Sequence, residues 1–178
     1  TTCGWMMWNW LMSSLYFGST VILFDGSPGY PSMIDYLSMI DRLKINVFGT
    51  SPKFLRSLQD SKPDLSSLKL DSLETIHSTG APLMPEQYDY VYQHIKQDVL
   101  LANIAGGTDL MGGFYLGNPV QPVYRGELQC APLGIDSTCI DENGCKIIDQ
   151  EGELACMQSF PSRPLYFLND PNRERLNS

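Results

Sequence analysis

The sequence has 178 residues, and its 12 Lys and Arg against 20 Asp and Glu give a formal net charge of −8. Nucleic-acid backbones and anionic membrane surfaces are bound by clustered Lys and Arg, so this acidic balance excludes both as partners and favours a small molecule or another protein. Apolar residues make up 43% of the chain, enough for a sizeable hydrophobic core in one domain or two lobes.

The apolar and cysteine patterns predict a soluble, cytoplasmic protein. No stretch reaches the about 18 uninterrupted apolar residues that a membrane helix needs. The five cysteines are odd in number and form no Cys-x-x-Cys pair, which favours reduced thiols over disulfides or a zinc site. The chain begins at Thr1 with no signal-type leader, and we interpret it as part of something larger.

The first 113 residues repeat one pattern four times. Each repeat consists of an apolar segment with helical spacing, a short β-type run and a loop of small residues. Helices are predicted at 8–15, at 31–43 with Pro31 opening the helix, at 54–58 and at 85–95. Strands are predicted at 21–24, 45–48, 73–77 and 99–101. This alternation predicts an α/β fold with a mostly parallel sheet and flanking helices, in which all four loops lie at one edge.

From about Pro119 the pattern changes to short alternating strands, predicted at 126–130, 134–140, 146–148 and 153–157. Between two of them, Asp141–Gly144 is predicted as a two-residue hairpin turn because Asn-Gly tolerates positive φ. We therefore expect two parts, an α/β parallel-sheet subdomain over residues 1–118 and a small, antiparallel, barrel-like β-rich lobe over residues 119–178.

Five ordered motifs together resemble the adenylate-forming acyl-CoA synthetases, over essentially the whole chain, and most of all the members that activate acetoacetate. The motifs are Gly-Trp-Met-Met-Trp-Asn-Trp at 4–10, Ser-Thr-Gly-Ala-Pro-Leu at 78–83, Gly-Gly-Thr-Asp at 106–109, Val-Tyr-Arg-Gly-Glu-Leu-Gln at 123–129 and Gly-Glu-Leu at 152–154.

The resemblance implies an ATP-dependent acid–thiol ligase with a place in ketone-body and lipid metabolism. Such an enzyme makes an acyl-adenylate from acetoacetate and ATP with Mg²⁺, and then transfers the acyl group to coenzyme A. It also implies that the chain is the middle of the large N-terminal domain, because the phosphate loop ending in Lys and the C-terminal catalytic lysine are not in these 178 residues. We therefore expect the chain alone to be inactive, and its partner to be the remainder of the same protein.

By resemblance, Gly80, Ala81 and Pro82 form the turn that packs against adenine, and Gly107 and Thr108 bind the phosphate. Thr108 and the adjacent Asp109 are the implied catalytic residues. Asp109 stands where most family members have a glutamate that helps to hold Mg²⁺, a hard cation that prefers oxygen ligands. The residues alone leave open that both motifs are ordinary turns.

The resemblance also implies a substrate pocket formed by Trp5, Met6, Met7 and Thr79, whereas Trp8 is assigned to the core. Trp and Met at helical spacing are otherwise typical core residues.

Gly106 is the implied determinant of acid size. In the similar acetyl-CoA synthetases this position carries a tryptophan that closes the pocket, so a glycine is expected to leave room for acetoacetate. The alternative is that the loop needs positive φ at Gly106.

Two other functions stay open on the sequence. A related acyl-CoA synthetase for another short-chain acid would be separated by testing a panel of acids. A non-catalytic α/β binding module would be separated by whether the flanking sequence contains the phosphate loop and the terminal lysine.

Overall fold

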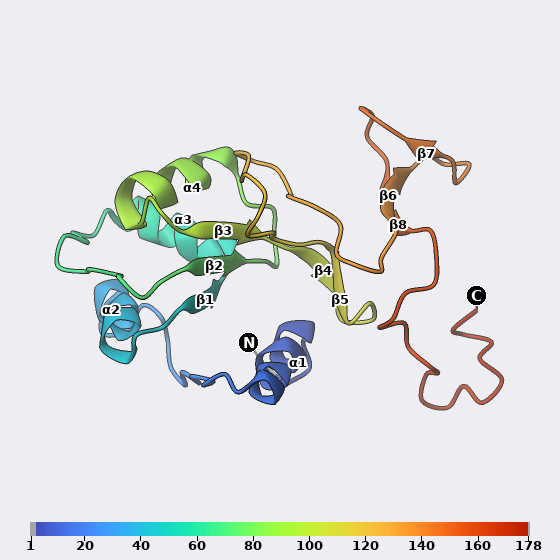
Figure 1. The fold of residues 1–178 in the computed structure, drawn as a ribbon, viewed down its shortest axis with the longest axis horizontal. Helices are drawn as coiled ribbons and strands as arrows, with labels where there is room; N and C mark the ends of the chain where they lie inside the picture. The colour runs from blue at the N-terminus through green and yellow to red at the C-terminus, as the bar shows by residue number, and fades with distance from the viewer. Residues whose placement is uncertain (1–2, 178) are drawn as a thin grey trace. The chain divides into compact units, whose positions relative to one another are not determined.

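The computed structural model describes residues 3–177, which divide into two units (Figure 1). The sheet unit consists of Leu23–Ala105 and Tyr115–Cys130. The hairpin unit consists of the described residues up to Ile22, of Gly106–Phe114 and of the residues from Ala131 onward. The predicted boundary between residues 118 and 119 coincides with no border of these units, and it stays a prediction.

The sheet unit is built on three parallel strands in the order β1-β2-β3. Its elements in chain order are α2 (Met33–Leu43), β1 (Val47–Thr50), α3 (Pro52–Ser61), β2 (Thr75–Ser78), α4 (Pro85–Tyr90), a π-helical turn (Val91–Ile95) and β3 (Leu100–Asn103). This confirms the predicted alternation of helices with a parallel sheet. Each observed strand begins and ends one or two residues later than predicted.

Serine and proline side chains set where the helices of the sheet unit begin. Ser51 caps α3 by accepting a hydrogen bond from the Phe54 amide at 3.3 Å, and Pro85 is the first residue of α4. The prediction for Pro31 is wrong, because α2 begins after Ser32, whose hydroxyl accepts from the Asp35 amide at 3.1 Å.

The core of the sheet unit lies between the sheet and its helices. Figure 1 shows α3 and α4 running along the sheet, and these two helices also contact each other. The rings of Tyr36, Phe48 and Phe54 form one cluster with centroids 5.6–6.2 Å apart. The most deeply buried apolar side chains are those of Leu37, Ile40, Leu55, Leu58, Leu73, Ile76, Tyr88, Val91 and Leu101.

The predicted strand at 21–24 is absent from the described residues. Phe24 instead packs its ring on Tyr36, 4.9 Å between centroids, and the border between the two units falls directly before Leu23. A β-strand needs a neighbour for its backbone hydrogen bonds, and residues 21–24 pair with no described strand. Phe24 contributes a ring contact instead, whereas Leu23 is exposed.

The hairpin unit contains one N-terminal helix and short strands. Its elements are α1 (Met6–Ser13), a 3₁₀ turn (Ser14–Phe17), β4 (Ala105–Gly107) and β5 (Gly112–Tyr115) apart from Ala105 and Tyr115, β6 (Ser137–Ile140), β7 (Lys146–Ile147) and β8 (Glu153–Cys156). As predicted, the first helical segment ends at Gly18, whose φ is 76°. Strands β7, β6 and β8 form an antiparallel sheet, as expected for the β-rich part.

The hairpin between β6 and β7 is confirmed, but its turn differs from the prediction. Only Gly144 has positive φ, at 75°, whereas Asn143 does not. The Asp141 carboxylate accepts hydrogen bonds from the amides of Asn143 and Cys145 at 2.9 and 2.8 Å. The turn is thus longer than two residues and is closed by an aspartate side chain.

The predicted strand at 126–130 is wrong apart from its last residue. Cys130 pairs with Leu116 in an isolated antiparallel bridge, and residues 126–129 are in no strand. Gln129 donates to the Asn118 carbonyl at 3.0 Å and accepts from its amide at 3.0 Å. The Gln129 side chain thus satisfies both backbone groups of Asn118, which need no partner strand.

Strands β4 and β5 approach each other closely at glycines. A Cβ added to Gly106 would collide with the carbonyl oxygen of Gly112 and lie 2.9 Å from the Gly113 Cα. The φ of Gly106 is not positive, so the alternative based on positive φ is wrong. Gly106 is needed for close backbone packing. At Gly107, by contrast, an added Cβ meets nothing within 4 Å.

No helix in residues 3–177 is both long enough and apolar enough to cross a membrane.

We predict that Gly106→Ala lowers the free energy of unfolding by about 1–3 kcal/mol, the usual cost of overpacking against atoms that cannot move away. Gly107→Ala is the matched control and should change it by less than about 0.5 kcal/mol. Urea unfolding followed by circular dichroism measures both. Equal stability of the two variants would show that β4 and β5 can separate without cost.

Candidate functional site

The carboxyl ends of the three parallel strands form the edge at which a ligand site is predicted. Thr50, Ser78 and Asn103 are the last residues of β1, β2 and β3, and they lie in register with one another. Ser78 is fully buried, and its hydroxyl has no hydrogen-bond partner among the described residues. In parallel sheets with flanking helices, this edge is where ligands bind.

The predicted adenine turn follows β2 at this edge. Gly80 has a φ of 95°, a conformation that favours glycine, and an added Cβ there would meet nothing within 4 Å. Ala81 and Pro82 are also exposed. Thr79 is half-buried, and its hydroxyl donates to the Ile104 carbonyl at 2.9 Å. The turn therefore presents an open, flat stretch of backbone.

Gln87 holds the other end of this turn, and the sequence analysis did not single it out. Its side-chain oxygen accepts from the Met84 amide at 2.9 Å, while its nitrogen donates to the Pro52 carbonyl at 2.6 Å. Gln87 is 4% exposed. A Gln at the third position of a helix is a known capping signal, and this signal could have identified the residue.

The Gly-Gly-Thr-Asp motif lies partly in a strand, because Gly106 and Gly107 belong to β4. Thr108 and Asp109 follow in a turn, where the Thr108 carbonyl accepts from the Met111 amide at 3.1 Å. Both side chains are exposed. They are open to solvent and so available to a ligand.

The structure places the predicted pocket residues of α1 in the same unit as this turn. Asn9 donates from its side chain to the Met111 sulfur at 3.3 Å, which joins α1 to the turn. Trp5 is 60% exposed, Met7 is half-buried, and Met6 is buried. Trp8, assigned to the core by the sequence, is only half-buried.

Asp109 lines a shallow cavity of about 320 Å³ within the hairpin unit. The rest of the lining is mostly apolar, with Arg163 as its cation. The lining residues besides these two are Leu110, Phe114, Leu154, Ala155, Cys156, Phe160, Pro164, Phe167 and Leu176. Burial raises the pKa of the Cys156 thiol, so at neutral pH this thiol is protonated.

Among residues 3–177, no group of three His, Cys, Asp or Glu side chains could hold a metal ion. Asp109 therefore belongs to no ready-made set of three metal ligands among these residues. Mg²⁺ is commonly bound by one or two carboxylates together with substrate phosphates and water, so a lone exposed aspartate fits a metal that arrives with a nucleotide.

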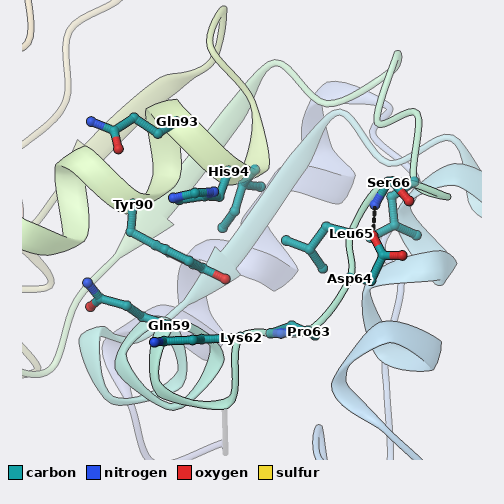
Figure 2. Close-up of a pocket in the computed structure, with 11 residues that line it drawn as sticks. Gln59, Lys62, Pro63, Asp64, Leu65, Ser66, Tyr90, Gln93 and His94 are labelled. Atoms are coloured by element: carbon teal, nitrogen blue, oxygen red, sulfur yellow. Dashed lines mark hydrogen bonds between the residues drawn. The ribbon is translucent and has the colours of Figure 1, made fainter.

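A second cavity, of about 690 Å³, lies in the sheet unit, and none of its lining residues is a predicted site residue (Figure 2). Figure 2 shows Gln59 and Lys62 on one side and Tyr90 and His94 on the other. The Tyr90 and His94 rings lie 5.2 Å apart, and burial raises the pKa of Tyr90. Gln59, Tyr90 and His94 lie near the C-terminal ends of their helical segments and Lys62 directly follows α3, so the cavity is at the sheet edge opposite to the turn at 80–82.

The motif at 123–129 packs against α4 through an ion pair and a hydrogen bond. Arg125 and Asp89 form an ion pair with nitrogen–oxygen distances of 2.9–3.0 Å. The Tyr88 hydroxyl donates to the Glu127 carbonyl at 2.9 Å. These contacts give the motif a structural role within the sheet unit.

Comparisons with known proteins agree with the sequence motifs. Residues 2–159 match the family described as AMP-binding enzyme. An acetoacetyl-CoA synthetase of Danio rerio is 47% identical over 174 residues, and one of Xenopus tropicalis is 44% identical over 174 residues. Each alignment covers 97% of this chain and 26% of the relative.

A solved structure shows the same fold. Acetoacetyl-CoA synthetase from Streptomyces lividans superposes with a TM-score of 0.88 at 34% identity, covering 99% of this chain and 28% of that protein. The chain thus spans about a quarter of the length of the relatives that it matches. Because the family match covers most of the sequence, including the turn at 80–82 and the Gly-Gly-Thr-Asp motif, the chain belongs to the AMP-binding enzyme family.

Proposed function

We propose that the chain is part of an ATP-dependent ligase that activates acetoacetate as an acyl-adenylate and transfers it to coenzyme A. One observation carries this proposal: relatives named acetoacetyl-CoA synthetase match 97% of the chain at 44–47% identity. The complete protein that contains this chain would carry out the reaction.

In this proposal the exposed turn Gly80–Pro82 is the surface on which adenine stacks. The open space at Gly80 and its positive φ support this role, since a flat ring needs close approach to backbone. Adenine would rest on a preformed surface, because both ends of the turn are held by side-chain hydrogen bonds.

Gly107, Thr108 and Asp109 would act at the phosphates. The Thr108 hydroxyl is exposed and can donate to an α-phosphate oxygen, and Gly107 leaves room for the phosphate beside the backbone. Asp109 would hold Mg²⁺, directly or through water, and the metal supplies charge neutralisation where the phosphates develop negative charge. Thr108 and Asp109 are the catalytic residues of this proposal.

The path of the acid and of the pantetheine arm of coenzyme A would be lined by Trp5, Met6, Met7 and Gly106. The hydrogen bond from Asn9 to Met111 supports this, because it ties the helix that carries the first three to the turn after Gly106. Because the Met6 side chain is buried, it would support the wall of the pocket without contacting the substrate. Trp5 is the residue best exposed for contact with a substrate.

A ligase for another short-chain acid is the second candidate. The observation that favours it is the close backbone packing at Gly106. This packing alone explains why the residue is glycine, so no residue is left that specifies the size of the acid.

A cytoplasmic location is also part of the proposal. It is supported by the cysteines, because all five are free thiols and a reducing compartment keeps them so.

For the full-length protein we predict that pyrophosphate release from ATP is fastest with acetoacetate. The panel should include acetate, propionate, butyrate and 3-hydroxybutyrate, compared by kcat/KM. Butyrate matches acetoacetate in length but lacks the ketone, so it separates recognition of chain length from recognition of the ketone. A higher kcat/KM for any other acid would favour the second candidate.

For Asp109→Ala we predict that kcat for adenylation falls about ten- to a hundredfold while the KM for ATP changes less. A metal-held phosphate gains most as charge develops in the transition state, which is why the rate is affected more than binding. Asp109→Glu should retain most of the rate. The control is Asp71→Ala, which removes an exposed carboxylate from the sheet unit. An unchanged kcat at saturating Mg²⁺ in Asp109→Ala would remove Asp109 from the site.

A further inference from the structure

The turn between β2 and α4 is held at both ends by polar side chains and makes no side-chain contact at Gly80 in between. β2 is the central strand, so the loop that follows it lies between the loop after β1 and the end of β3. Side-chain hydrogen bonds connect the segment after β2 to the residue after β3 and to the start of α3.

On the β3 side, Thr79 carries the connection. Its hydroxyl donates to the Ile104 carbonyl at 2.9 Å, and the Ile104 amide donates to the Ser78 carbonyl at 2.8 Å. The side-chain hydrogen bond thus continues the pairing of β2 with β3 by one residue beyond the ends of the two strands. Thr79 has used its only donor in this bond, so the hydroxyl cannot also donate to a ligand.

On the β1 side, Gln87 carries the connection. Its amide group bonds the Met84 amide at the end of the turn and the Pro52 carbonyl at the start of α3. The 2.6 Å bond to Pro52 is made by a side chain that is almost fully buried, so water does not compete with it.

We propose that Thr79 and Gln87 are positioning residues that hold the Gly80–Pro82 turn in the shape that binds adenine. This inference rests on the proposed function, and it gives Thr79 a role through the turn where the resemblance places it in the substrate pocket. A turn that is already ordered costs less entropy when the nucleotide binds, so the two residues act on ATP affinity.

The test is Thr79→Val in the full-length protein, because valine keeps the shape of threonine and removes only the hydroxyl. The KM for ATP should rise about two- to tenfold, the range expected for the loss of one ordinary hydrogen bond, while kcat stays unchanged. General loss of folded protein would instead lower the apparent kcat at constant KM. Thr79→Ser, which keeps the hydroxyl, should restore the KM.

Thr75→Val is the matched control. It removes a threonine hydroxyl from the opposite end of the same strand, where no side-chain hydrogen bond is formed among the described residues, and should leave the KM for ATP unchanged. Gln87→Met, an apolar side chain of similar length, should raise the same KM as Thr79→Val does. An unchanged KM for ATP in Thr79→Val, or a raised one in Thr79→Ser, overturns the proposal.

Hydrogen–deuterium exchange separates this proposal from the proposed function, because it needs no activity. The peptide that covers residues 79–84 should exchange faster in Thr79→Val than in the wild type and the Thr75→Val control. Equal exchange in all three proteins would overturn the positioning role even if the enzyme is active. A wild type that releases no pyrophosphate with any acid would overturn the proposed function, whatever the exchange rates are.

Discussion

Parallel pairing of β1, β2 and β3 is the constraint on which the rest of the sheet unit depends. Parallel strands must be joined by crossovers, so each strand leaves the sheet at the same edge and each helix returns the chain to the other. Thr50, Ser78 and Asn103 consequently end together. The loops that follow are neighbours although 25 or more residues separate them in sequence, as the bond from Thr79 to Ile104 shows.

The two units satisfy the backbone of their irregular segments in the same way. In the sheet unit, single side chains such as Gln87 and Gln129 each satisfy several backbone groups, so irregular segments are held without further strands. In the hairpin unit, Asp141 does the same for the turn between β6 and β7. Buried or half-buried amides and carboxylates thus replace regular secondary structure where the chain must turn.

The sequence predicts the order and type of most elements because their apolar periodicity is strong, as in α2 and α4. It places the strands too early, since small residues such as Gly49 and Thr50 resemble loop residues when they are in fact the ends of strands. The prediction of a strand at 21–24 is wrong for a different reason. Its composition fits a strand, but whether a neighbour exists is decided by tertiary structure.

Within the candidate site, the motifs single out the turn at 80–82 and the Gly-Gly-Thr-Asp segment as candidates, because glycine, proline and threonine stand out in the sequence. For Gln87 the sequence offers only the capping signal toward Met84, because its contact with Pro52 joins residues 35 positions apart. The hydrogen bond between Asn9 and Met111 joins residues 102 positions apart and is equally invisible. Local sequence patterns indicate which residues are candidates for binding or catalysis. The contacts that position these residues are long-range and cannot be predicted from such patterns.

The contact between β4 and β5 also bears on how acid selectivity could evolve. A larger residue at Gly106 meets the backbone of Gly112 and Gly113, so a single substitution there cannot simply fill space beside a substrate. Relatives with a bulky residue at this position would need a compensating shift in the facing strand. The order of mutations would then matter, because the first step alone is deleterious, and a change of substrate by this route requires at least two coupled changes.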